Sequence, residues 1–278
     1  MTTEVPADHN IRLNDGAHIP RLGLGVMFVS TEDVPALMKD ATAIGYRHFD
    51  TATHYFNEAG VGEGLRQIEI DRDAVFVTTK LPNAAHGYDE ALHAFEASER
   101  AIGRIDLYLI HWPQPIKGRY RDSWRALVRL QNEGRLRSIG VANFPVPLLD
   151  ELIADTGVTP AVNQVELHPS YQQHALRADL AKRGIATESW SPLERGQTLS
   201  NPAIQAIAER RGYSPAQIVL AWHLQNNLIV IPKAADRRHL SDNFAALDLH
   251  LAADDLAQIA LLDQADGNFG PDPMLPEK

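Results

Sequence analysis

The sequence contains no cysteine at any of its 278 positions. A disulfide framework, a thiolate zinc site and a cysteine nucleophile are therefore excluded. The sequence also lacks a run of about 18 apolar residues, the length needed to span a membrane as a helix. Its first ten residues, MTTEVPADHN, lack the apolar core of a signal peptide. These absences predict a soluble, cytoplasmic protein.

Positive charge is also scarce. The chain has 26 Lys and Arg against 36 Asp and Glu, which gives a formal net charge of −10. It contains no sustained basic run, which argues against nucleic acid or an anionic membrane as the main partner. Hydrophobic residues make up 44% of the chain, enough for a large core and for one or two domains. The expected partner is a small molecule.

The hydrophobic pattern predicts a short N-terminal hairpin followed by alternating strands and helices. An Asn14-Asp15-Gly16 turn between two short apolar segments is a strong hairpin signal. The expected strands cover residues 22–26, 46–50, 75–80, 105–110, 136–141, 161–165, 185–188 and 228–231. The expected helices cover residues 34–44, 58–66, 89–102, 122–133, 146–155, 172–182, 201–211 and 215–225, with one further helix and a tail after the last strand.

This alternation favours a closed (β/α)8 TIM barrel, because strands joined by helices pair in parallel and there are eight of them. The competing fold is an open doubly wound sheet, which needs a G-x-G-x-x-G motif after its first strand. The segment 23–25, GLG, lacks the third glycine. The segment 60–64, GVGEG, has the wrong spacing and lies in a helix-like stretch. No linker or change of composition divides the chain, so we expect one domain over residues 1–278.

Seven of the eight expected strands end in a polar or aromatic side chain, on the face where barrel enzymes keep their chemistry. These residues are Asp50, Lys80, His111, Asn143, Gln164, Trp190 and Lys233, and Tyr55 lies in the loop after the second strand. Each has an ordinary structural explanation when taken alone, such as a solvated loop residue or a packed ring. Barrel packing does not require all of them at one face, so their coincidence indicates a site.

The chemistry of this set points to proton transfer. Asp50 is expected to pair with the Lys80 ammonium, and Lys80 is expected to lower the pKa of the nearby Tyr55 hydroxyl. Tyr55 can then donate a proton to a carbonyl oxygen that gains negative charge. His111 can hold that oxygen by a hydrogen bond or act as a base, and the sequence leaves both roles open.

A hydride has to come from a cofactor, because no side chain supplies one. Trp190 offers a flat face for a nicotinamide ring. Asn143 and Gln164 offer donors and acceptors for its carboxamide. The same set of strand ends therefore accommodates both a proton donor and a redox cofactor.

Five segments together resemble the signatures of the aldo-keto reductase family, in the family's order, over nearly the whole chain. They read GYRHFDTATHYFNEAGVG (45–62), LYLIHWP (107–113), SIGVANF (138–144), AVNQVELHP (161–169) and VIPKAADRRHLSDNF (230–244). The resemblance includes the hairpin, which in the family plugs the barrel bottom. It implies NAD(P)H-dependent reduction of aldehydes or ketones by a catalytic tetrad of Asp50, Tyr55, Lys80 and His111. The segment ESWSPL and the short loop after His111 are most similar to the bacterial 2,5-diketo-D-gluconic acid reductases.

Three positions differ from the family pattern. Ala142 replaces the serine that usually precedes Asn143, and Ala234 and His239 replace a serine and an arginine near Lys233 in the phosphate-binding segment. A neutral imidazole cannot make the bidentate contacts of a guanidinium. We therefore predict NADPH use with a weakened preference, and measurable use of NADH.

The other cofactor contacts are expected in two segments, because helix N-termini and nearby amides bind phosphates. They are Ser191 and Leu193 after the seventh strand, and Arg238 and Asn243 after the eighth.

The substrate pocket is expected to be shallow and open, because the loop after His111 and the tail after Asp263 are short. Its expected wall comprises Met27, His54, Trp112 and Phe144, with Phe28 and Phe56 beside them. Such a pocket suits small polar carbonyls resembling methylglyoxal or 2,5-diketogluconate, or a broad range of substrates. Ordinary packing remains the alternative explanation for Trp112 and Phe144.

Two other functions remain open. Barrels of this family also serve as nicotinamide-binding regulatory subunits, in which turnover is incidental. A hydrolytic or metal-dependent barrel is the second alternative, although His111, His168 and His174 have no spacing that suggests a metal site. We expect no metal, and the resemblance favours a monomer.

Overall fold

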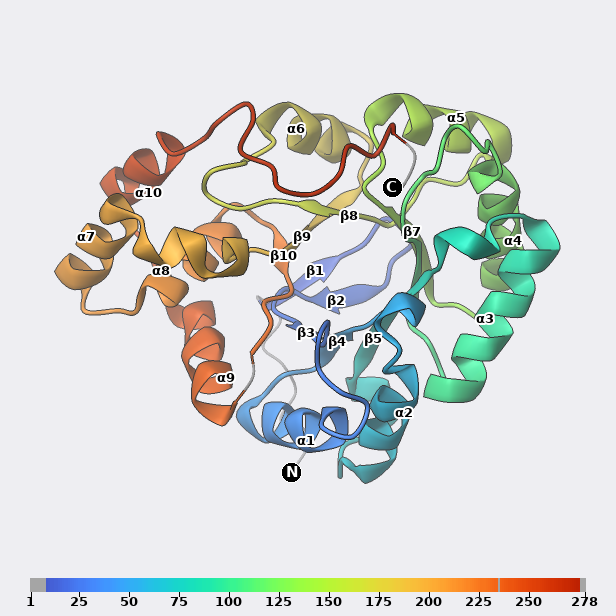
Figure 1. The fold of residues 1–278 in the computed structure, drawn as a ribbon, viewed down its shortest axis with the longest axis horizontal. Coiled ribbons are helices and arrows are strands. Elements are labelled where there is room, and N and C mark those ends of the chain that lie inside the picture. The colour runs from blue at the N-terminus through green and yellow to red at the C-terminus, as the bar shows by residue number, and fades with distance from the viewer. Residues whose placement is uncertain (1–8, 235, 276–278) are drawn as a thin grey trace.

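Eight parallel strands form the centre of the computed structural model, which describes residues 9–234 and 236–275 (Figure 1). They are β3 (Leu24–Gly25), β4 (His48–Asp50), β5 (Phe76–Leu81), β6 (Leu107–Ile110), β7 (Ser138–Ala142), β8 (Val162–Glu166), β9 (Ala186–Trp190) and β10 (Ile229–Val230). Each strand pairs with the next along the chain. The ring closes at a parallel bridge between Leu22 and Val230, where the Gly23 amide donates to the Val230 oxygen over 2.8 Å. The expected TIM barrel is confirmed.

Ten helices in the described ranges surround the strands. They are α1 (Val34–Ile44), α2 (Glu58–Gln67), α3 (Tyr88–Ile102), α4 (Tyr120–Asn132), α5 (Val146–Thr156), α6 (His174–Lys182), α7 (Pro202–Arg211), α8 (Pro215–Gln225), α9 (Arg237–Phe244) and α10 (Ala253–Ala260). The bounds of α1 to α8 lie within two residues of the predicted ones. Two helices, α9 and α10, follow β10, where one was predicted. None of these helices is long and apolar enough to cross a membrane.

The predicted hairpin closes one end of the barrel. Strands β1 (Asn10–Arg12) and β2 (His18–Pro20) pair antiparallel around a turn in which the Leu13 amide donates to the Ala17 oxygen over 2.8 Å. Ile19 is fully buried and packs in one cluster with Phe76 and Leu107, which start β5 and β6. The strands therefore present their opposite, C-terminal ends to the space where a site can form.

The glycine cluster of residues 60–64 lies inside α2, so it is not a phosphate-binding loop. A Cβ atom on Gly60 would overlap the carbonyl oxygen of Thr31, and one on Gly62 would overlap the carbonyl oxygen of Ala101 at the end of α3. These glycines allow α2 to approach its neighbours closely. Their spacing reflects helix packing.

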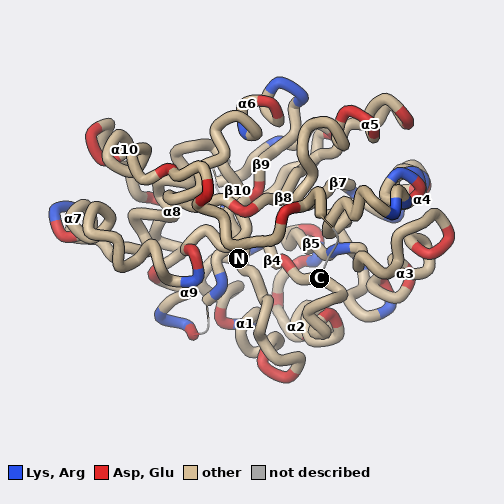
Figure 2. The backbone as a smooth tube through the Cα atoms, turned by 45° about the horizontal axis from the view of Figure 1, so that its top comes forward, with Lys and Arg blue, Asp and Glu red and all other residues tan. Residues whose placement is uncertain are grey.

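Charged residues occur mainly on the outer helices, but acidic positions also lie on β4, β8 and β9 inside the ring (Figure 2). Asp50, Glu166 and Glu188 occupy these strands, and each is at most 5% exposed. A buried carboxyl group is costly unless it is paired or protonated. These three groups mark where the barrel departs from ordinary core packing.

We expect Gly62→Ala to destabilise the fold by about 1–3 kcal/mol, because the added methyl group overlaps the Ala101 backbone, which cannot move without α3. Urea unfolding followed by circular dichroism measures this. Gln67→Ala, at an exposed position of the same helix, should change the free energy of unfolding by less than about 0.5 kcal/mol. Equal stability of the two variants would contradict the packing role.

Candidate active site

The side chains of Asp50 and Lys80 form a buried ion pair at the ends of β4 and β5. The Lys80 Nζ lies 2.6 Å from Asp50 Oδ1 and 2.9 Å from the Thr51 carbonyl oxygen. Burial raises the pKa of Asp50, and the Lys80 ammonium opposes that rise. Burial alone lowers the pKa of Lys80, but the surrounding negative groups, Asp50 foremost, outweigh it and keep the ammonium charged. The predicted pairing is present in the structure.

Tyr55 reaches this pair from the loop after β4. The Lys80 Nζ donates to the Tyr55 hydroxyl over 3.5 Å, and lies 5.1 Å from the centroid of its ring. Tyr55 ends a single 3-10 turn, Thr53–Tyr55, and the Thr53 hydroxyl donates to the Lys80 carbonyl oxygen over 3.2 Å. The loop and the end of β5 therefore hold the phenol and the ammonium together.

Asn57 ties the same loop to the loop after β3. Its Oδ1 accepts from the Thr51 hydroxyl over 2.7 Å, and its Nδ2 donates to the carbonyl oxygens of Val26 and Val29 over 2.8 and 3.0 Å. The residue is 1% exposed. Asn57 was not among the residues predicted from the sequence, although it lies within the GYRHFDTATHYFNEAGVG segment that indicated the site.

The net effect on the pKa of Tyr55 differs from the sequence-based expectation. Burial raises the pKa of Tyr55, and the opposing effect of the Lys80 ammonium does not overcome it. Tyr55 therefore keeps its proton at neutral pH. The ammonium beside it stabilises the phenolate that remains once the proton has been given away, which is the arrangement a proton donor needs.

His111 completes the expected tetrad from the end of β6. Its ring centroid lies 6.1 Å from that of Tyr55, at an interplanar angle of 79°. Burial lowers the pKa of His111 to about 3, with Lys80 and His54 adding to the effect. The imidazole is neutral at physiological pH, so it is a hydrogen-bond donor through one nitrogen and a very weak base.

Gln164, an expected cofactor contact, is hydrogen-bonded to two carboxyl groups in the barrel interior. Its Nε2 donates to Asp50 Oδ2 over 2.9 Å and to Glu188 Oε2 over 3.0 Å, and the residue is 2% exposed. Glu188 in turn has its Oε1 3.7 Å from His48 Nε2. Glu188 and His48 were not among the predicted site residues, because both occupy interior positions of short strands in the sequence pattern.

Asn143 and Trp190 hold one another at the ends of β7 and β9. The Trp190 Nε1 donates to Asn143 Oδ1 over 2.9 Å, and Asn143 Nδ2 donates to the His111 carbonyl oxygen over 3.1 Å. Asn143 has a left-handed backbone, with φ 63°. The indole is half-buried, so its plane is fixed while part of it faces solvent. Ala142 is fully buried.

The C-terminal segment packs against this tryptophan. The Phe269 ring meets Trp190 edge to face, with centroids 5.8 Å apart. The amides of Phe269 and Gly270 donate to Glu166 Oε1 and Oε2, both over 2.8 Å. This anchoring of the tail to β8 was not anticipated, because no local pattern links residues so far apart in sequence.

The two segments expected to bind cofactor phosphates lie next to β9 and β10. Ser191 and Leu193 follow β9 and are half-buried. Lys233 is exposed, with its Nζ 5.7 Å from the centroid of the Phe28 ring, while Ala234 is buried.

Four further residues of this region belong to α9 or its cap. Arg238 and His239 are exposed on the first turn of α9, and Asn243 is buried farther along. Asp236 caps the helix by accepting from the His239 amide over 2.9 Å, and its Oδ2 lies 3.2 Å from His239 Nδ1. His239 therefore already has an acidic partner.

The expected pocket residues occupy different environments. Met27 and His54 are exposed, and Trp112 is half-buried. Phe144 is fully buried, with its ring centroid 5.7 Å from that of Tyr120, which favours packing over a place in an open pocket wall. Phe28 and Phe56 are 77% and 82% exposed, so two large rings stand in solvent beside the site.

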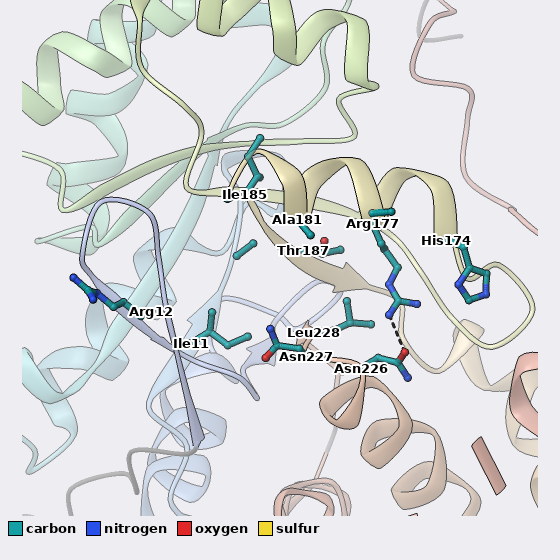
Figure 3. A pocket seen from close by; sticks show the side chains of 13 residues that line it. Ile11, Arg12, His174, Arg177, Ala181, Ile185, Thr187, Asn226, Asn227 and Leu228 are labelled. Atoms are coloured by element: carbon teal, nitrogen blue, oxygen red, sulfur yellow. Dashed lines mark hydrogen bonds between the residues drawn. The ribbon is translucent and has the colours of Figure 1, made fainter. Parts of the chain in front are cut away.

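A cavity of about 530 Å³ lies at the opposite, hairpin end of the barrel (Figure 3). Ile11, Ile185 and Leu228 line it, and the Arg177 Nη2 donates to Asn226 Oδ1 over 2.8 Å at its edge. None of the four tetrad residues lines this cavity. The site is therefore located by its chemistry, and not by the volume of a cavity.

A metal centre is not apparent in the parts of the chain that the structure describes. No group of three or more His, Asp or Glu side chains there is arranged to hold an ion.

Comparison with known proteins agrees with this geometry. A family model described as the aldo/keto reductase family matches residues 21–264. The chain is 44% identical over 265 residues to methylglyoxal reductase DkgA of Escherichia coli O157:H7, covering 95% of this chain and 96% of that one. It is 43% identical over 278 residues to morphine 6-dehydrogenase of Pseudomonas putida, covering 95% and 94%. A mutant of Gox0644 solved in complex with NADPH superposes with a TM-score of 0.92, at 46% identity, covering 95% and 97%.

The buried pair predicts a pH-dependent loss of stability in Lys80→Met. We expect this variant to lose about 3–5 kcal/mol at pH 8, because Asp50 is left buried without its ammonium. Burial raises the pKa of Asp50, so the carboxyl group takes up a proton as the pH falls, and the deficit should shrink towards pH 5. Urea unfolding at both pH values measures this.

Two variants control that experiment. Asp50→Asn with Lys80→Met removes both charges and should recover part of the loss. Lys182→Met breaks an ion pair with Asp179 in which the lysine side chain is 73% exposed, and should change stability little. A deficit in Lys80→Met that does not depend on pH would show that packing, and not the unpaired Asp50, is responsible.

Proposed function

This chain belongs to the aldo/keto reductase family, and we propose that within the family it reduces small polar carbonyl compounds with NADPH, Tyr55 being the proton donor. Family membership makes it an NAD(P)H-dependent oxidoreductase that reduces carbonyl groups. The observation that supports the assignment of Tyr55 is the position of Lys80. Its Nζ contacts Asp50 Oδ1 at 2.6 Å and the Tyr55 hydroxyl at 3.5 Å.

The proton is transferred from the Tyr55 hydroxyl to the carbonyl oxygen of the substrate. The phenolate left behind is stabilised by the Lys80 ammonium, whose charge Asp50 maintains within the barrel. NADPH, when bound, supplies the hydride. Tyr55 is returned to its protonated form by solvent, since its pKa is raised by burial.

His111 orients the carbonyl oxygen in this proposal. Its low pKa, about 3, makes it neutral throughout the physiological range, so it offers an N–H donor and not a positive charge. A base this weak removes a proton poorly at neutral pH. The hydrogen-bonding role is therefore favoured over the basic role that the sequence left open.

The residues at the strand ends fit a nicotinamide. Trp190 has a plane fixed by Asn143 and a partly open surface, which suits stacking. Asn143 keeps one more N–H and one more lone pair than its present bonds use. Gln164 contributes from beneath, where its Nε2 is already shared by two carboxyl groups.

The phosphate region supports the predicted weak preference for NADPH. Lys233 is exposed and available to a 2′-phosphate. Close by, Asp236 caps α9 and pairs with His239, so a carboxylate occupies the helix end where an anion would bind most favourably. Ser191, Leu193, Arg238 and Asn243 remain our proposed further contacts to the cofactor.

Small polar carbonyls are the proposed substrates. Met27, Phe28 and Phe56 are exposed at the mouth of the site, which gives it an open rim with Trp112 farther in. The similarity to methylglyoxal reductase DkgA supports compounds of that size and polarity, and 2,5-diketogluconate is a further candidate. We expect the protein to act as a cytoplasmic monomer.

Tyr55→Phe should lower kcat for carbonyl reduction by about 10²–10⁴, the usual contribution of a general acid. The assay follows NADPH oxidation with methylglyoxal, phenylglyoxal, an aromatic aldehyde and 2,5-diketogluconate. Tyr213→Phe, at an exposed tyrosine, is the matched control and should have the wild-type kcat. Full activity of Tyr55→Phe would remove the proposed donor. Binding of NADPH without turnover of any of these carbonyls would favour a regulatory subunit.

His239→Arg should raise the ratio of kcat/KM for NADPH over NADH by about tenfold, because a guanidinium can bind a 2′-phosphate bidentately. The wild-type ratio should be modest. Arg238→Ala tests the neighbouring guanidinium, which lies 3.4 Å from His239 Nε2. A wild-type ratio near 10³ that falls in Arg238→Ala would show that Arg238 already binds the phosphate.

A further inference from the structure

Glu188 is a fully buried carboxyl group in the interior of the barrel, which the reaction described above does not use. It lies on β9, between Gln164 of β8 and Ile229 of β10, its partners in the sheet. Glu188 is 0% exposed. The His48 side chain, whose Nε2 lies 3.7 Å from Glu188 Oε1, is also 0% exposed. Burying an ionised carboxyl group costs free energy unless a cation pairs with it. The surroundings of Glu188 therefore decide whether it is charged.

The groups facing Glu188 include one cation and several acidic or neutral groups. β4 contributes Asp50 and His48, β5 contributes Lys80, and the loop after β4 contributes Tyr55, while β8 and β10 contribute the neutral Gln164 and the apolar Ile229. Burial lowers the pKa of His48 to about 3, so it is neutral and offers no positive charge. Lys80 is the ammonium in this group.

Asp50 and Glu188 do not contact the Lys80 ammonium equally. Asp50 Oδ1 lies 2.6 Å from the Lys80 Nζ, so Asp50 takes the direct ion pair. Glu188 has a hydrogen bond from Gln164 to its Oε2, over 3.0 Å, while its Oε1 is buried with no hydrogen-bond partner among the described residues. If both acids were ionised, one ammonium would face two buried negative charges.

Gln164 connects the two acids. Its Nε2 donates one N–H to Asp50 Oδ2 and the other to Glu188 Oε2, over 2.9 and 3.0 Å. Glu188 therefore fixes the amide that in turn fixes the second oxygen of Asp50. A change at Glu188 reaches Lys80 and Tyr55 through this chain of contacts and through its charge.

We propose that Glu188 is a positioning residue that holds Gln164 against Asp50 and that carries a proton at neutral pH, leaving Asp50 as the single anion paired with Lys80. This inference rests on the proposed role of Tyr55 as proton donor. While Glu188 is protonated, the Lys80 ammonium stabilises the phenolate that Tyr55 forms when it gives up its proton.

Ionisation of Glu188 should slow the reduction. A second negative charge beside Lys80 disfavours a phenolate at Tyr55, so that proton donation becomes harder. Burial, together with repulsion from Asp50, raises the pKa of Glu188 to about 8, so this loss falls at mildly alkaline pH. Tyr55 itself titrates later, because burial raises its pKa above the usual value near 10.

The test compares the pH dependence of kcat in the wild type and in Glu188→Gln, an isosteric variant that keeps an oxygen to accept from Gln164 but cannot ionise. We expect the wild-type kcat to fall by about tenfold between pH 7 and pH 9.5, and to remain nearly level in Glu188→Gln over the same range. Glu188→Ala releases Gln164 and should have a lower kcat than Glu188→Gln at pH 7. Superimposable profiles for wild type and Glu188→Gln would overturn the proposal.

Glu58→Gln is the matched control. Glu58 is another buried carboxyl group whose pKa is raised by burial, but it accepts from the hydroxyls of Thr79 and Ser98 and does not contact Gln164. It should keep the alkaline fall of kcat. Loss of that fall in Glu58→Gln, with its persistence in Glu188→Gln, would assign the titration to Glu58 and refute the role of Glu188.

An infrared measurement separates this inference from the proposed function. A protonated carboxyl group absorbs apart from a carboxylate, so the difference between wild type and Glu188→Gln should show a protonated band at pH 7 that is lost by pH 9.5. Its absence at pH 7 would overturn the proposal even if Tyr55 is the proton donor. Its presence, with Tyr55→Phe fully active, would instead refute Tyr55 as donor while leaving Glu188 protonated.

Discussion

A single buried ammonium determines how the interior of this barrel is arranged. Lys80 is 0% exposed, and its charge survives there because Asp50 lies 2.6 Å away. Each neighbour then takes a state that this pair permits: Tyr55 is protonated, and His111 and His48 are neutral. The closed sheet excludes water from the pair and so strengthens every interaction within it. The protonation states around the pair therefore depend on a Lys80 ammonium that stays charged although it is buried.

The architecture was predictable because it depends on local patterns. Short apolar segments alternating with capped helices predicted the order of strands and helices. Asp50, Lys80 and His111 were predicted to share a face because they end parallel strands. The glycines of α2 were also assigned correctly to a helix. These inferences need only the periodicity of the chain.

The features that the sequence did not reveal depend on depth and on contacts between distant segments. The bonds from the Gln164 amide to two buried carboxyl groups were not anticipated, because the inward direction of a strand residue does not tell how far it lies from the mouth. Its contact with a cofactor stays a prediction. Phe144 was expected in a pocket wall and packs against Tyr120. The anchoring of Phe269 to Glu166 joins segments about a hundred residues apart, which no short motif encodes. The fall of the Tyr55 pKa was mispredicted because the effect of Lys80 was considered without the burial that accompanies it.

The bridge that closes the barrel joins Leu22 to Val230, and the hydrogen bonds there connect the segment of β3, the first barrel strand, with β10, the last. During synthesis, Asp50, Lys80 and His111 all leave the ribosome long before that partner exists. Until β10 arrives, β3 has an unpaired edge, and the ion pair has no complete wall to shield it from water. Closing the ring therefore requires a contact between residues far apart in sequence, and such contacts form slowly during folding. The buried pair of Asp50 and Lys80 is therefore enclosed only after β10 has been made.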